Sequence, residues 1–153
     1  DIIQFLQYNM RSQMFAKSLP MPMVKGALKR LDMLRTMPEL KENLWKITNA
    51  LQSGLRNAGF DLGTTQTCIT PVYLKGEIPE AMAMVHDLRE NHGVFCSIVV
   101  YPVIPKGLII LRLIPTARHT QADVDETITA FSAIREKLEN GIYKKVAAAM
   151  MAE

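Results

Sequence analysis

The stretch VFCSIVVYPVIPKGLIILRLI, residues 94–114, decides the expected fold. It holds two apolar runs, 94–100 and 108–114, and the loop between them contains two prolines. Continuous apolar runs of this length, rich in β-branched residues and bounded by turn residues, are typical of buried strands. The sequence therefore predicts two buried strands joined by a stiff loop.

A third strand and a helix precede this stretch. Residues 68–74 are rich in β-branched and aromatic side chains, and Pro71 cannot donate a hydrogen bond to a neighbouring strand. This combination predicts a strand near the edge of the sheet. Pro79 and Glu80 then open a helix, whose end is predicted at Gly93.

Further helices are predicted on both sides of the strands. Apolar residues recur at helical spacing over 21–35 and again from Leu40 to Leu55. Thr36 and Glu39 have the spacing of a capping box for the second of these helices. Thr120 and Asp123 have the same form before a helix that runs to about residue 140.

Together these elements predict an α+β fold of two layers. A small, mostly antiparallel three-stranded sheet is expected to be covered by helices, because a sheet with apolar side chains must bury them against another layer. The chain has 153 residues, of which 48% are apolar and 22% charged, as expected for one globular domain.

Composition excludes several classes of function. The net charge is only +3 and the basic residues alternate with acidic ones, which gives little support to nucleic-acid binding. The most apolar segment, 98–114, is interrupted by prolines and charged residues, so no membrane span is predicted. Cys68 and Cys96 lie in apolar segments, which favours reduced thiols and a cytoplasmic location and leaves a disulfide as the alternative.

Few side chains form a pattern that specifies a reaction. His86, His92 and His119 have no second ligand at metal spacing, so a structural or solvated role is expected and no metal site is predicted. No Ser-His-Asp set, carboxylate pair or Cys-His pair is found either. The residues alone are compatible with a non-catalytic α/β module that binds a small molecule or regulates a partner.

Arg112 is the strongest candidate for a binding residue. Its neighbours 109–111 and 113–114 are all apolar, which predicts a buried strand where an unpaired guanidinium would be costly. A substrate carboxylate suits the two parallel donors of an arginine. The alternatives are an internal acidic partner or an outward-facing position.

Five segments together resemble a known family, the α-oxoamine synthases. These segments are 15–20, 37–45, 54–60, 102–107 and 111–120, in the order in which the family has them. The family includes 8-amino-7-oxononanoate synthase, glycine C-acetyltransferase (2-amino-3-ketobutyrate coenzyme A ligase), 5-aminolevulinate synthase and serine palmitoyltransferase. The resemblance is specific because the Pro-x-x-Pro-x-Gly loop, the arginine strand and the Ala-x-His-Thr cap occur together.

The resemblance implies part of an enzyme that depends on pyridoxal phosphate. Such enzymes condense an amino acid, here glycine, alanine or serine, with an acyl-CoA to give an α-amino ketone, and they are cytoplasmic homodimers of fold type I. The lysine that binds the cofactor covalently would precede Asp1, so no catalytic residue is expected in this chain. The isolated chain is expected to be inactive and to bind no cofactor.

The resemblance also implies domain boundaries. Residues 1–20 would be the end of the large-domain region and a connecting loop, residues 21–142 the C-terminal small domain, and residues 143–153 a tail.

Site residues are implied by the resemblance position by position. Arg112 would bind the carboxylate of the amino acid, and Pro102, Pro105 and Gly107 would form an active-site loop. Ala16 and Lys17 match a position where the family commonly has a hydroxyl that contacts the cofactor phosphate across the dimer. Ala16 lacks that hydroxyl, so only backbone N–H groups and the Lys17 amine are left for the phosphate.

Overall fold

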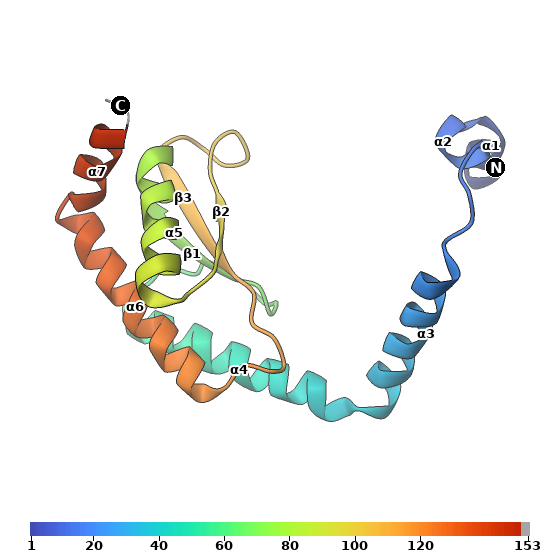
Figure 1. Ribbon diagram of the computed structural model, residues 1–153, viewed down its shortest axis with the longest axis horizontal. Coiled ribbons are helices and arrows are strands. Elements are labelled where there is room, and N and C mark those ends of the chain that lie inside the picture. The colour runs from blue at the N-terminus through green and yellow to red at the C-terminus, as the bar shows by residue number, and fades with distance from the viewer. Residues whose placement is uncertain (151–153) are drawn as a thin grey trace. The chain divides into compact units, whose positions relative to one another are not determined.

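The computed structural model describes residues 1–150. The chain divides into two compact units, of which the first comprises residues 1–38 and the second begins at Glu39. The first unit contains the helices α1 (Ile2–Asn9), α2 (Arg11–Met14) and α3 (Met21–Thr36) (Figure 1). Its large apolar side chains are mostly exposed, and none of the three helices has a buried residue.

The capping box predicted at Thr36 and Glu39 is wrong. Thr36 is the last residue of α3, and its hydroxyl donates to the Asp32 carbonyl at 2.9 Å. Threonine inside a helix commonly bonds the carbonyl four residues earlier, and Thr36 keeps the helical backbone of α3, whereas an N-cap residue has a non-helical backbone. Helix α4 (Pro38–Asn57) begins at Pro38 instead, where the fixed φ of proline suits the first turn.

The second unit contains a three-stranded antiparallel sheet. Its strands are β1 (Thr70–Lys75), β2 (Ser97–Val99) and β3 (Leu108–Leu113), and their order in the sheet is β1-β3-β2. Strand β3 pairs antiparallel with both neighbours. The predicted α+β architecture is confirmed, and β1 lies at an edge, where Pro71 needs no partner for a missing N–H.

Only one face of the sheet is buried. Along β3, Ile109, Leu111 and Leu113 are buried, whereas Leu108 and Arg112 are exposed. The prediction of a strand buried on both faces was therefore wrong for β3. An unbroken apolar run does not distinguish a strand covered on both faces from one covered on a single face.

Helices cover the buried face. Strand β3 shares one apolar core with α4, α5 (Ile78–His92) and α6 (Gln121–Glu139), and Figure 1 shows α5 lying against the sheet. Phe60 and Phe131 meet edge to face in this core, with ring centroids 5.9 Å apart. A Cβ on Gly54 of α4 would overlap the Ile128 side chain of α6, so glycine allows these helices to approach closely.

The ends of α5 and α6 follow the sequence signals. Gly93 ends α5 with a left-handed φ of 66°, and the Thr120 N–H donates to the Asp123 carboxylate at 2.7 Å before α6. The reciprocal bond, from the Asp123 N–H to the Thr120 hydroxyl, measures 3.3 Å. The capping box predicted at Thr120 is thus confirmed.

A buried carboxylate joins the last three helices. Asp87 of α5 accepts hydrogen bonds from Lys137 of α6 at 2.7 Å and from Tyr143 of α7 (Ile142–Met150) at 2.6 Å. Burial raises the pKa of Asp87, but the hydrogen bonds from Lys137, Tyr143 and Asn91 outweigh it and hold the pKa at about 2. The predicted tail 143–153 is helical as far as Met150, and residues 151–153 lie outside the described residues.

Candidate functional site

Arg112 lies on the face of the sheet that the helices leave open. It is the fifth residue of the central strand β3 and is exposed, so the prediction of a buried guanidinium is wrong. The reason is the alternation of the strand, which sends Leu111 and Leu113 into the core and Arg112 to the opposite side. The outward-facing alternative is the one that the structure has.

The side chain of Arg112 is held from β2. Ser97 lies directly opposite Arg112 in the antiparallel register, and the Arg112 Nε donates to the Ser97 hydroxyl oxygen at 2.9 Å. The same hydroxyl donates to the Arg112 backbone carbonyl at 3.4 Å. Among the described residues, no carboxylate lies within ion-pair distance of the guanidinium.

On the β1 side, Arg112 meets an apolar neighbour. Its partner there is Pro71, which has neither an N–H nor a polar side chain. The next row across the open face consists of Tyr73, Ile110 and Val99. The two terminal Nη groups of Arg112 are therefore left to bind an anion from outside the described residues.

The segment after β3 is fixed by polar contacts. The Asn43 amide of α4 donates to the Ala117 carbonyl, and the Thr116 N–H donates to the His119 Nδ1 at 2.9 Å. The backbone hydrogen bond from Thr120 holds the pKa of Asp123 below its ordinary value. His119 thus has the structural role predicted for it, and Asn43 is a positioning contact that the sequence analysis missed.

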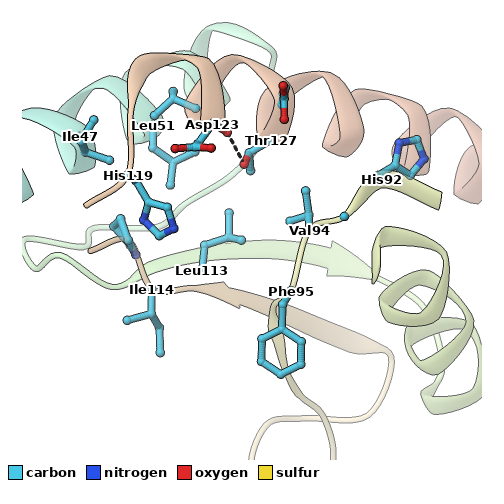
Figure 2. Close-up of a pocket in the computed structure, with 14 residues that line it drawn as sticks. Ile47, Leu51, His92, Val94, Phe95, Leu113, Ile114, His119, Asp123 and Thr127 are labelled. Atoms are coloured by element: carbon cyan, nitrogen blue, oxygen red, sulfur yellow. Dashed lines mark hydrogen bonds between the residues drawn. The ribbon is translucent and has the colours of Figure 1, made fainter. Parts of the chain in front are cut away.

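A pocket of about 170 Å³ lies between α4, α6 and the ends of β2 and β3. Figure 2 shows His119 and Asp123 on one side of it and His92 beside Val94 on the other. The His92 Nε2 is buried and has no hydrogen-bond partner among the described residues. The pocket is smaller than the roughly 300 Å³ at which ligand sites begin, and neither Arg112 nor a lysine lines it.

The loop 101–107 lies at the start of β3, away from Arg112. The Gly76 N–H donates to the Gly107 carbonyl at 3.0 Å, and the Lys106 amine lies 5.0 Å from the centre of the Tyr101 ring. Arg112 lies four positions after Leu108, which is roughly 13 Å along a strand. Pro102, Pro105 and Gly107 are thus not brought next to the guanidinium.

Ala16 and Lys17 lie in the first unit, between α2 and α3. Both are exposed, and the Ala16 N–H donates to the Gln13 carbonyl at 3.3 Å. Within the described part of the chain, no acidic group pairs with the Lys17 amine. An exposed amine suits one edge of a phosphate group, although the Lys17 amine alone does not enclose one.

Two kinds of feature are absent from residues 1–150. No cluster of three histidine, cysteine or acidic residues that could hold a metal ion is found there. No helix of this part of the chain is long and apolar enough to cross a membrane. Cys68 and Cys96 are both free, and burial raises the pKa of the Cys96 thiol to about 11.

Comparisons with known proteins give a consistent result. The model of the family described as aminotransferase class I and II matches residues 1–131. A cysteate-C-fatty acyltransferase from Capnocytophaga ochracea is 63% identical over 99% of this chain and 36% of its own length. An 8-amino-7-oxononanoate synthase from Symbiobacterium thermophilum is 34% identical over 90% of this chain and 34% of its own.

A solved structure agrees with these relatives. A high-resolution structure of SPT with its PLP internal aldimine superposes with a TM-score of 0.76 at 30% identity, and the match covers 90% of this chain and 34% of that one. The chain thus spans about a third of the length of the curated relatives that it matches.

Proposed function

Because this chain belongs to the aminotransferase class I and II family, we propose that it is part of a pyridoxal-phosphate-dependent acyltransferase that joins an amino acid to a fatty acyl-CoA. The observation that carries the proposal is Arg112, whose terminal Nη groups are unpaired among the described residues on the open face of the sheet. An arginine held in this way is suited to bind a carboxylate with two parallel hydrogen bonds.

The amino acid proposed for the parent enzyme is cysteate. The support is the high identity to a protein named for cysteate and a fatty acyl group, which extends over almost the whole chain. Glycine, alanine and serine, which the sequence resemblance implied, are the competing substrates. A homodimer and a cytoplasmic location remain predictions.

Arg112 is proposed to orient the amino acid. Two parallel bonds to the carboxylate would fix both the position and the rotation of the substrate. A single point charge would leave the substrate free to rotate. The apolar side chains of Ile110 and Val99 beside Arg112 would strengthen this ion pair by lowering the local dielectric constant once substrate covers the face. Correct orientation of the Cα bonds is what such an enzyme must supply.

Pyridoxal phosphate, when bound, supplies the electron sink of the reaction. In this chain, Lys17 and the backbone beside Ala16 are proposed to contact its phosphate from one edge. The lysine that binds it covalently is proposed to lie outside these residues. The loop with Pro102, Pro105 and Gly107 is proposed to border the acyl-CoA end of the site, away from Arg112.

The reaction is tested on the full-length parent enzyme with cysteate and a long-chain acyl-CoA. In the proposed reaction the Cα–carboxylate bond breaks with release of CO2, the thioester C–S bond breaks, and a bond forms between the acyl carbon and the Cα. The departing CoA thiolate takes up a proton from solvent and leaves as a thiol. We expect CoA thiol to appear together with an aminoketone that carries the sulfonate, as measured by a thiol reagent and mass spectrometry. Serine, alanine and glycine are assayed in parallel, and a higher kcat/KM with any of them would contradict the choice of cysteate.

A further inference from the structure

The Ser97 hydroxyl controls how Arg112 can bind. Arginine has five N–H donors, and it can hold a carboxylate either end-on through both Nη groups or side-on through Nε and one Nη. The Nε of Arg112 already donates to Ser97 at 2.9 Å. The side-on mode would require this bond to break, so the end-on mode is the one left available.

A second hydrogen bond holds the Ser97 hydroxyl in place while it accepts from the Arg112 Nε. This hydroxyl also donates to the backbone carbonyl of Arg112 at 3.4 Å, and the two residues are partners in the β2–β3 ladder. The hydroxyl therefore acts as both acceptor and donor to the same residue. It limits rotation of the guanidinium before substrate binds. Without this restraint, the flexible arginine side chain would lose that freedom only on binding, at a cost in conformational entropy.

Among the described residues, Ser97 is the one side chain that accepts a hydrogen bond from Arg112. The partner of Arg112 on the other side is Pro71, and Ile110 and Val99 of the next row are apolar. None of these three can accept a hydrogen bond from Nε through its side chain.

We infer that Ser97 is a positioning residue, which holds Arg112 so that its two Nη groups meet the amino-acid carboxylate end-on. The inference rests on the proposed function, because it takes Arg112 to bind the substrate carboxylate. It adds a residue from a different strand to the site. It also states which pair of nitrogens binds.

The test uses the full-length parent enzyme with Ser97→Ala and the conservative Ser97→Thr, which keeps the hydroxyl. We expect Ser97→Ala to raise the KM for cysteate about 3- to 10-fold, the cost of ordering one long side chain, while kcat changes less than 2-fold. Ser97→Thr should restore most of the affinity. Ser132→Ala is the matched control, because it removes a hydroxyl bond from α6 of the same unit, far from Arg112 along the chain.

A second readout separates positioning from a general disturbance of the site. Taurine keeps the amine and sulfonate of cysteate but has no carboxylate for Arg112 to bind. Its inhibition constant against cysteate should therefore be the same for the wild-type enzyme and for Ser97→Ala. Weakening of cysteate and taurine alike, or an unchanged KM for cysteate, would overturn the role of Ser97.

The design distinguishes failure of this inference from failure of the proposed substrate. If the wild-type enzyme uses serine and not cysteate, the choice of cysteate fails, and the same comparison is made with serine against ethanolamine. If no amino acid is a substrate, both the proposed function and the role of Ser97 are rejected. If the wild-type enzyme uses cysteate and Ser97→Ala raises the KM for cysteate as expected, both the proposed function and the role of Ser97 are supported.

Discussion

At the scale of single residues, the guanidinium of Arg112 sets the chemistry of the open sheet face. Lysine could keep the positive charge at this position, but it lacks the planar fork that binds two carboxylate oxygens in parallel. We expect Arg112→Lys in the parent enzyme to raise the KM for the amino acid about 10- to 100-fold, the usual worth of a hydrogen bond to a charged group. Steady-state kinetics with saturating acyl-CoA measure this.

The matched control for that substitution is Arg118→Lys, which changes an exposed arginine six residues further along the chain. It should leave the KM near the wild-type value. If Arg112→Lys left both affinity and turnover unchanged, Arg112 would have no role in binding the substrate.

Sequence reasoning proposed Arg112 as a binding residue but assigned it the wrong environment. Its apolar neighbours predicted burial, because residues 108–114 contain no polar residue that would mark an exposed face other than Arg112 itself. Ser97 was missed because its importance depends on register, and the pairing of Ser97 with Arg112 is set by how β2 and β3 align. A lone hydroxyl within an otherwise apolar strand was the available signal.

At the scale of elements, the Asp87 cluster determines how α5, α6 and α7 respond to pH. The pKa of Asp87 is about 2 in the folded chain, below its ordinary value of 3.8. Its stabilising effect is therefore complete only above about pH 5 and is lost as the pH falls through 3.8 toward 2. We expect this loss to be on the order of 1 to 2 kcal/mol, after allowance for screening by solvent.

The measurement compares urea unfolding of the wild-type chain and Asp87→Asn from pH 5 to pH 2. The wild-type protein should lose more stability over this range than the variant, because the variant has no carboxylate to protonate at position 87. Asp125→Asn, which changes an exposed carboxylate of α6, should follow the wild-type curve. Parallel curves for Asp87→Asn and the wild type would contradict the assignment.

Elements whose ends are marked by local chemistry were predicted well. Gly93 and the pair Thr120 and Asp123 act through neighbours a few residues away, so their signals can be read directly from the sequence. Strand β2 was predicted as 94–100 and is only Ser97–Val99, since pairing with β3 determines its length. Thr36 was misjudged because its hydroxyl can either accept from a backbone N–H of the next helix or donate back to a carbonyl of its own helix. The bond back to the Asp32 carbonyl is the one formed.

At the scale of the whole molecule, the chain is expected to depend on the rest of its parent for the cofactor. We expect the isolated 153-residue chain, incubated with pyridoxal phosphate, reduced with borohydride and separated by gel filtration, to retain no stoichiometric cofactor. The physical reason is that the lysine which binds the cofactor covalently is proposed to lie outside these residues, and Lys17 lies exposed in a loop. Absorbance and intact mass measure retention.

The full-length parent is the positive control for that experiment and should retain one cofactor per chain. Modification of a single lysine of the isolated chain in a 1:1 ratio would contradict the expectation. Such a result would place the covalent site within these residues.

Strand β3 alternates between two environments, and this has a consequence for how such proteins diverge. Packing in the core constrains Ile109, Leu111 and Leu113. The open face, where a ligand or partner can approach, presents Leu108, Ile110 and Arg112. Selection for folding thus acts mainly on the buried residues of this six-residue strand, and the residues of the open face can change with less effect on the core. A lineage can therefore change the residues of the open face and keep an inherited interior, so that the strand gains a new surface while the fold stays the same.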